Sequence, residues 1–162
     1  MARHETAAER SEVVDAIERM AFSLVALTSA AMAADGQGIE PTFRQWRLLV
    51  VLGESADGYR LGEIAERIGG SAPSASRLVR RLEARRLVTI SRDPTDRRGI
   101  RVVLSPEGSA MRTAVIGARR RLISETLGAV PLSPGFPREL SDLARALGMP
   151  AVPVVDTLPG PA

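Results

Sequence analysis

The stretch "SRDPTDRRGIRVVLS", residues 91–105, joins a loop dense in charge to an alternating apolar run. Ile100, Val102 and Leu104 recur with the period of two that is typical of a strand, and residues 88–91 alternate in the same way. We therefore expect two strands joined by a loop. The loop has no apolar side chain to hold it on a core, so we expect its arginines to contact something outside the protein.

Two short helices are predicted before this hairpin. The segment "LGEIAERIGG", residues 61–70, has apolar residues at helical spacing and stops at two glycines. Ser71 is a typical N-cap for the next segment, "APSASRLVRRLEARRL", which tolerates Pro73 in its first turn. Its predicted buried stripe consists of Ala75, Leu78, Val79 and Leu82. Two helices, a tight turn and a hairpin predict a winged helix-turn-helix.

The second of these helices has the side chains of a DNA-recognition helix. With Leu78 and Leu82 buried, the opposite face carries Ser74, Arg77 and Arg81, with Pro73 and Ser76 beside it. Such a helix fits the major groove, about 12 Å wide, and arginine binds guanine or phosphate through its fork of N–H groups. A solvated helix face would have the same spacing, and that alternative stays open at this point.

The loop of the hairpin is predicted to be a DNA-contacting wing. A loop between paired strands projects from its domain, so Arg97 or Arg98 can reach a narrow, electronegative minor groove. Asp96 gains nothing from approaching DNA, and we expect it to orient one of these guanidinium groups and stiffen the loop. The alternative is ordinary turn chemistry with a surface ion pair worth about 0–1 kcal/mol.

Helices are also predicted at both ends of the chain. Residues 8–34 carry an apolar stripe at three- and four-residue steps, and residues 138–148 form a shorter amphipathic helix. Together they offer more apolar surface than one small winged domain covers, so we expect a homodimer. The predicted interface residues are Val13, Ile17, Leu24, Leu140, Leu143 and Leu147.

Composition places the chain in a mainly α class and argues against an enzyme. There is no Cys, the single His is His4, and Gly69-Gly70-Ser71 lacks the Lys of a phosphate-binding loop, so we expect no catalytic residue, cofactor or metal site. No window reaches about 18 consecutive apolar residues, and the N-terminus carries acids where a signal peptide is apolar. We expect a cytoplasmic protein without a membrane partner.

Positive charge is concentrated in one part of the chain. Residues 71–101 hold nine Arg and three acids, a net charge of +6, whereas the remainder carries −3. A compact positive zone on a slightly negative body is typical of a protein that docks on phosphates. On charge alone, a solvated charged face is an equally good interpretation.

With these motifs in place, the sequence resembles the MarR (multiple antibiotic resistance regulator) transcription factors over about residues 10–148. The resemblance is most specific in "LGEIAERIGGSAPSASRLVRRLEARRLV" and "DPTDRRGIRVVLSPEG", within residues 61–108. It implies a homodimer whose terminal helices form the interface, and two winged domains on a pseudo-palindromic double-stranded DNA site. It also implies a small-molecule effector, commonly phenolic or anionic.

By this resemblance the recognition helix runs from Ser71 to Arg81 and the wing tip is Asp96, Arg97 and Arg98. Three positions depart from the family pattern. Arg86 replaces a usual Gly, so the turn there must accept a side chain, with some strain. Arg80 replaces a frequent Asp and adds to the DNA-binding charge, and Ser105 replaces a Thr cap.

The resulting prediction is a MarR-type transcriptional regulator, a repressor released by its effector. Its predicted parts are an N-terminal dimerisation helix (8–38), a winged DNA-binding domain (39–108), C-terminal dimerisation helices (109–148) and a disordered Pro-rich tail (149–162). The alternative is a winged-helix interaction module or anti-activator without DNA binding. Six side chains could line an effector pocket, although the first two are more typical of a core and the arginines of a surface: Trp46, Phe22, Phe43, Arg44, Arg47 and Arg112.

Overall fold

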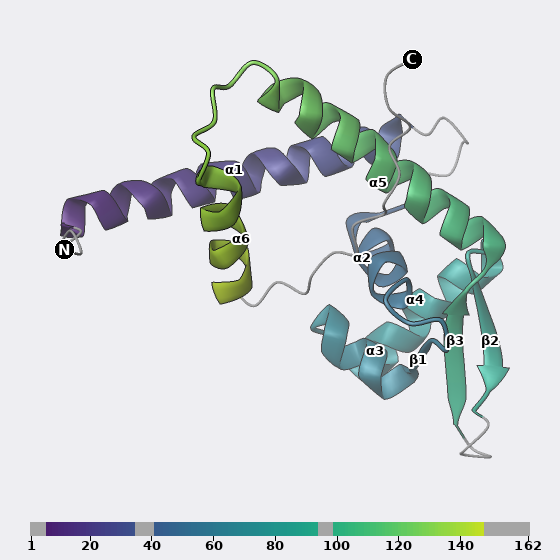
Figure 1. Ribbon diagram of the computed structural model, residues 1–162. Helices are drawn as coiled ribbons and strands as arrows, with labels where there is room; N and C mark the ends of the chain where they lie inside the picture. Colours follow the sequence, from purple (N-terminus) through teal and green to yellow (C-terminus); the bar gives the residue numbers. More distant parts are fainter. Residues whose placement is uncertain (1–5, 35–40, 94–98, 148–162) are drawn as a thin grey trace. The chain divides into compact units, whose positions relative to one another are not determined.

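The structure of the 162-residue chain is a computed structural model that describes residues 6–34, 41–93 and 99–147. It is mainly helical with one small sheet, as expected (Figure 1). By its internal contacts the chain divides into two compact units, Met1–Glu125 and Thr126–Ala162. The elements in chain order are α1 (Ala7–Ala33), α2 (Phe43–Leu52), β1 (Tyr59–Arg60), α3 (Leu61–Ile68), α4 (Ala72–Ala84), β2 (Val88–Arg92), β3 (Ile100–Leu104), α5 (Pro106–Leu127) and α6 (Phe136–Ala146).

Local capping signals set the ends of the helices in the winged domain. Thr42 and Gln45 form a capping box at the start of α2, in which each side chain accepts a hydrogen bond from the other residue's N–H. α3 ends at Gly69, whose φ of 67° is the left-handed conformation that glycine adopts without strain. The hydroxyl of Ser71 then accepts from the N–H of Ser74 and begins α4. The predicted turn between the two helices is confirmed.

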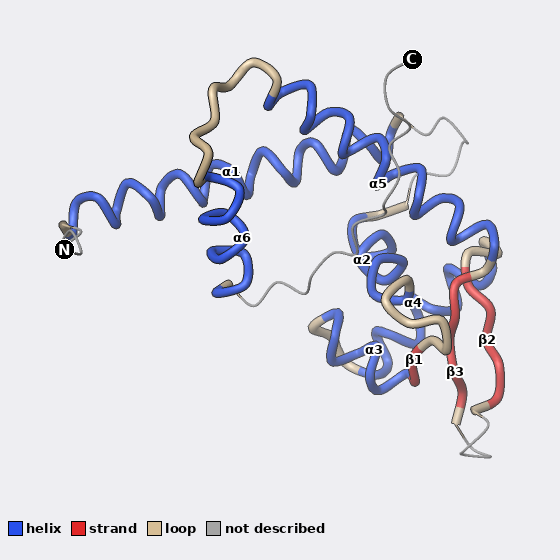
Figure 2. The backbone as a smooth tube through the Cα atoms, viewed as in Figure 1, coloured by secondary structure: helices blue, strands red, loops and turns tan. Residues whose placement is uncertain are grey.

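The sheet has three antiparallel strands in the order β1-β3-β2, drawn in red in Figure 2. β2 and β3 form the predicted hairpin, with Val88 opposite Leu104. β1 adds a short third strand, with Tyr59 opposite Val102. The loop tip, residues 94–98, lies outside the described residues.

The core of the winged domain forms where α2, α3 and α4 pack against the sheet. On α4, Ala75, Val79 and Leu82 are buried as predicted, and Leu78 is half-buried against the same cluster. The largest fully buried side chains of this core are Leu48, Leu49, Leu52, Ile64, Val79, Leu82 and Val102. Because this stripe fixes one face of α4 inward, the opposite face must point to solvent.

A second, smaller core joins the last turn of α1 to α2 and α5. Trp46 packs there with Ala31, Met32, Val115 and Ile116. On α1 the buried residues are Thr28, Ala31 and Met32, whereas the preceding part of the predicted apolar stripe is largely exposed. α1 is also long and apolar enough to cross a membrane by length and composition alone, a property shared with helices that pack in soluble proteins.

The start of α5 is fastened to the connection between α4 and β2. The hydroxyl of Ser105 donates to the carbonyl of Arg86 and accepts from the N–H of Gly108 at 2.9 Å, as expected of an N-cap. A Cβ on residue 108 would come within 2.9 Å of the carbonyl carbon of Leu87, so only glycine permits this approach. These contacts join the start of α5 to the turn that precedes the wing.

In the second unit, α6 begins at Phe136, two residues before the predicted start. Pro137 lies in the first turn of α6, where its missing N–H costs nothing. The predicted Pro-rich tail, residues 149–162, lies outside the described residues.

Candidate nucleic-acid interface

The outward face of α4 carries the predicted DNA-contacting residues. Ser71, Pro73 and the three arginines Arg77, Arg80 and Arg81 are exposed, while Ser74 and Ser76 are half-buried. Within the described ranges, no carboxylate lies within 4 Å of these three guanidinium groups and no hydrogen bond engages them. They are therefore available to an external anion. We call Arg77, Arg80 and Arg81 the α4 arginine face.

The other arginines of the basic segment have different surroundings. Arg85, after the last residue of α4, donates from Nη1 to Oε1 of Gln45 at 2.8 Å. Burial lowers the pKa of its guanidinium, and its buried Nε has no partner in the described structure. Arg85 thus ties α4 to the capping box of α2. Net charge alone does not distinguish such a structural arginine from a DNA-binding one.

The base of the wing is organised by a buried carboxylate. The side chain of Asp93 is fully buried and accepts from Nε of Arg60 at 2.6 Å and from Nε of Arg101 at 3.2 Å. Its backbone N–H also donates to the carbonyl of Gly99 at 2.9 Å, which closes the loop. Arg101 donates further to the carbonyls of Asp57 and Gly58. One carboxylate therefore connects β1, β2 and β3.

Sequence reasoning missed this ion-pair network. Asp93 entered only the alternative interpretation of the loop as ordinary turn chemistry. The organising role was given to Asp96, which lies outside the described residues together with Arg97 and Arg98. The available signal was an acid and an arginine on the two sides of one loop, Asp93 and Arg101. Arg60 could not have been found from the hairpin, because it reaches Asp93 only through the pairing of β1 with β3.

The predicted dimer-interface residues lie mostly at the surface of the single chain. Val13, Leu24, Leu140 and Leu147 are exposed, and Ile17 and Leu143 are half-buried. Phe22, on α1, is 77% exposed, so its predicted core position is wrong. The interface itself remains a prediction.

The remaining candidate pocket residues separate into three environments. Trp46 belongs to the core, as expected, and Phe43, Arg44 and Arg47 are exposed or engaged at the surface. Arg112 was expected at the surface, but only 8% of it is exposed. Burial lowers the pKa of the Arg112 guanidinium, and the Glu54 carboxylate partly offsets that effect. Its surroundings are described below.

Comparison with known proteins identifies the winged segment. Residues 37–99 match the model of the MarR family. No curated protein matches the chain significantly. The matched segment contains α2 to β2, and with them the α4 arginine face and Asp93.

Solved structures resemble most of the chain. The Rv1404 protein of Mycobacterium tuberculosis is 26% identical, with a TM-score of 0.76, over 91% of this chain and 98% of its own. Sco3205 of Streptomyces coelicolor, a MarR-family regulator solved with DNA, is 23% identical, with a TM-score of 0.66 over 93% and 94% of the chains. CouR of Rhodococcus jostii, bound to p-coumaroyl-CoA, is 21% identical, with a TM-score of 0.66 over 90% and 97%.

Proposed function

Because residues 37–99 belong to the MarR family, whose members are transcription regulators and not enzymes, we propose that this chain is a homodimeric repressor of transcription. It binds a pseudo-palindromic operator in double-stranded DNA. The observation that carries the proposal is the α4 arginine face, three exposed guanidinium groups without a protein partner in the described structure.

The α4 arginine face is suited to the major groove. Arg77 and Arg81 are one helical turn apart, so both side chains leave the same side of α4. Guanidinium groups in this position bind phosphates or form paired hydrogen bonds with guanine. Ser74 and Ser76 place small hydroxyl groups near the start of the helix, where the backbone favours a phosphate. Sco3205, which resembles this chain, was solved with DNA, and that likeness supports the assignment.

The wing complements the helix. Asp93 holds the base of the hairpin through Arg60 and Arg101, so the loop that follows it starts from a fixed position. Arg97 and Arg98 then act as the minor-groove contacts, and Asp96 orients one of them. A fixed base lowers the entropy cost of ordering the wing on DNA.

Dimerisation follows from apolar surface that one chain leaves uncovered. α1 exposes Val13, Val14, Phe22 and Val25, and no described residue of α6 is fully buried. The terminal segments 8–38 and 109–148 pair with those of a second copy and bury this surface. In the dimer, two α4 helices lie about 34 Å apart, which is one turn of DNA.

α1 therefore serves as a dimerisation helix in the cytoplasm rather than as a membrane span. Its first half carries Glu9, Glu12, Asp15, Glu18 and Arg19, which suit a helix that faces water on one side. Its last turn packs in the core around Trp46, and insertion of α1 into a membrane would break these contacts.

A small organic effector releases the repressor. The dimer can adopt a form in which the spacing of its two α4 helices fits DNA and a form in which it does not. A ligand shifts the balance between these two forms only to the extent that its affinities for them differ. CouR, a structural neighbour of this chain, was solved with p-coumaroyl-CoA, an acyl-CoA with a phenolic group. We assign the same general class, phenolic or anionic, to the effector of this chain.

The direct test is DNA binding by a double variant of the α4 arginine face. We expect Arg77→Ala with Arg81→Ala to weaken binding to the promoter fragment beside the gene at least about tenfold, because charge-assisted contacts are lost. The slope of log K against log salt should fall by about 0.9 for each lost phosphate contact. Fluorescence anisotropy across a salt series measures both quantities.

The matched control removes the same charge elsewhere. Arg120→Ala with Arg121→Ala on α5 should leave the affinity and the slope close to those of the parent protein, provided that sedimentation shows the variant to be a dimer, because α5 belongs to the proposed dimerisation helices. Equal effects of the two double variants would show that only net charge matters and that α4 is not the recognition helix.

A further inference from the structure

Arg85 lies where the end of α4 meets the start of α2. It is the C-cap residue of α4, and its Nη1 donates to Oε1 of Gln45 at 2.8 Å. The same oxygen of Gln45 accepts the N–H of Thr42 at 2.9 Å, as part of the capping box that begins α2. Because α4 packs mainly against α3 and β2, this bond gives it a further connection, to the first turn of α2.

The first turn of α2 also belongs to the second core. Trp46 follows Gln45 directly, is only 3% exposed, and lies in one buried cluster with Met32 of α1 and Val115 of α5. These two helices fall in the segments that the proposed function assigns to dimerisation. A short path of contacts therefore runs from the dimerisation helices through Trp46, Gln45 and Arg85 to the end of α4.

Stability alone does not explain the side chains at this connection. The Nε of Arg85 is buried without a hydrogen-bond partner in the described structure, and the acceptor for its Nη1 is a neutral amide. A glutamate at position 45 would also complete the capping box, and it would pair with the buried charge. The guanidinium is thus less well satisfied than it could be, and proteins depart from full satisfaction mostly at functional positions.

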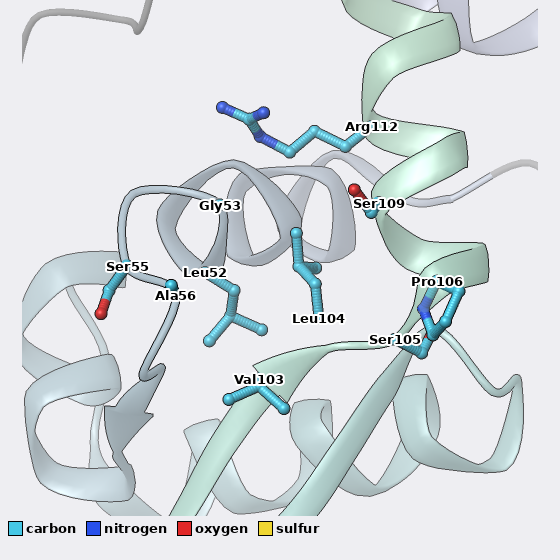
Figure 3. A pocket seen from close by; sticks show the side chains of 10 residues that line it. All are labelled: Leu52, Gly53, Ser55, Ala56, Val103, Leu104, Ser105, Pro106, Ser109 and Arg112. Atoms are coloured by element: carbon cyan, nitrogen blue, oxygen red, sulfur yellow. The ribbon is translucent and has the colours of Figure 1, made fainter.

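The other end of α2 has a related arrangement, shown in Figure 3. Arg112 extends from α5 over Gly53, the residue after α2, and is 8% exposed. A Cβ on residue 53 would come within 2.6 Å of Cζ of Arg112, and Nε and Nη2 of this arginine are buried without a partner in the described structure. A cavity of about 430 Å³ borders the same end of α2. Arg112 joins α2 to α5 and Arg85 joins it to α4, so α2 has a buried guanidinium group at each end.

We propose that Arg85 is a positioning residue for operator recognition. Through Gln45 it fixes the C-terminal end of α4 on the core that carries the dimerisation helices, so the two α4 helices of a dimer keep one spacing. This assignment rests on the proposed function. Arg85 differs in role from the α4 arginine face, because its Nη1 is bonded to Gln45 and its Nε is buried, so it does not contact DNA itself.

The test measures how strictly the protein requires the natural spacing of its operator. The probe is the operator duplex located by footprinting in the promoter fragment beside the gene, and the same duplex with one base pair inserted at its centre. One base pair moves the half-sites apart by about 3.4 Å and turns them by about 35°. We expect the insertion to weaken binding of the parent protein at least about tenfold, because contacts to one half-site are lost.

Arg85→Met removes the connection and keeps a long side chain. It should bind the natural duplex at least about fivefold more weakly, and the insertion should cost it less than about threefold, because α4 is no longer preorganised for one spacing. Its slope of log K against log salt should equal that of the parent, since no phosphate contact is lost. Arg85→Lys keeps a donor for Gln45 and should recover most of the affinity and of the spacing requirement.

Two further variants separate positioning from a general loosening of the domain. Arg47 on α2 donates to the carbonyl of Arg67 on α3 at 3.3 Å, so Arg47→Met breaks an arginine bond between two helices without involving α4, and it should keep the spacing requirement. Gln45→Met removes the acceptor and should relax the requirement, and it supplies the test if Arg85→Met does not fold. Adding Arg85→Met to Gln45→Met should weaken operator binding no further, because both act through one bond.

Urea titration identifies the variants that are folded, and the outcomes are compared among those. The proposal is overturned if removing the Arg85–Gln45 bond leaves the affinity and the spacing requirement of the parent, if Arg47→Met relaxes that requirement equally, or if the effects of the Gln45 and Arg85 variants add. In each case a parent protein that binds the operator leaves the repressor standing without this positioning residue. A parent protein that binds no promoter fragment overturns the proposed function, and the role of Arg85 with it.

Discussion

At the scale of single residues, the wing depends on one carboxylate. Asp93 has no solvent-exposed side-chain surface, and two arginines from different strands donate to it. Burial makes these contacts stronger than those of an exposed pair, because water does not compete for the carboxylate. The sequence indicates a turn around Asp93-Pro94. The burial of the Asp93 side chain depends on how the strands pair, and the residue pattern around the turn does not indicate that pairing.

We expect Asp93→Ala to lower the free energy of unfolding by about 2 kcal/mol, because two charge-assisted hydrogen bonds are lost and two arginines lose their anion. It should also weaken operator binding by loosening the base of the wing. Urea titration measures the stability, and anisotropy measures the affinity.

An exposed ion pair supplies the control for this prediction. Asp142 accepts from Arg145 on α6, and both side chains are more than half exposed. Asp142→Ala should cost less than about 0.5 kcal/mol. A similar loss of stability in the two variants would mean that burial does not distinguish them, contrary to our interpretation of Asp93.

At the scale of elements, the N-caps that the sequence predicted are confirmed. Ser71 and Ser105 cap their helices as predicted, because an N-cap acts on N–H groups two or three positions later. The start of α6 was placed two residues late, because Pro137 serves equally as a breaker and as a first-turn residue. β1 could not be assigned from local pattern, since its two residues form a strand only by pairing with β3.

The turn between α4 and β2 confirms the strain expected there. Among the described residues other than glycine, Arg86 alone has a positive φ, of 59°, in the conformation that glycine adopts freely. We expect Arg86→Gly to be more stable than Arg86→Ala by about 1 kcal/mol, because alanine keeps the strained φ whereas glycine does not.

Comparing these two variants cancels the loss of the arginine side chain. Urea titration of both, with the parent protein alongside, measures the difference. If alanine proves as stable as glycine at position 86, the backbone carries no strain at this turn.

At the scale of the whole molecule, the sequence suggests kinds of partner, whereas it does not locate every site. The concentrated positive charge suggests DNA as a partner, and the apolar surface of the terminal helices suggests a second copy of the chain. Both expectations rest on surface for which one chain provides no partner. The cavity at Arg112 escaped prediction, because it requires α2, β3 and α5 to meet at Gly53. Such a meeting is a property of tertiary packing, and no residue spacing encodes it.

In the proposed complex, two chains together present two α4 helices to one duplex. The most direct measurement is the mass of the protein bound to a single operator duplex, determined by sedimentation at concentrations where the operator is saturated. We expect twice the 17.3 kDa mass of one chain on each duplex. A saturated complex that holds a single chain, with the parent affinity and salt dependence, would contradict it.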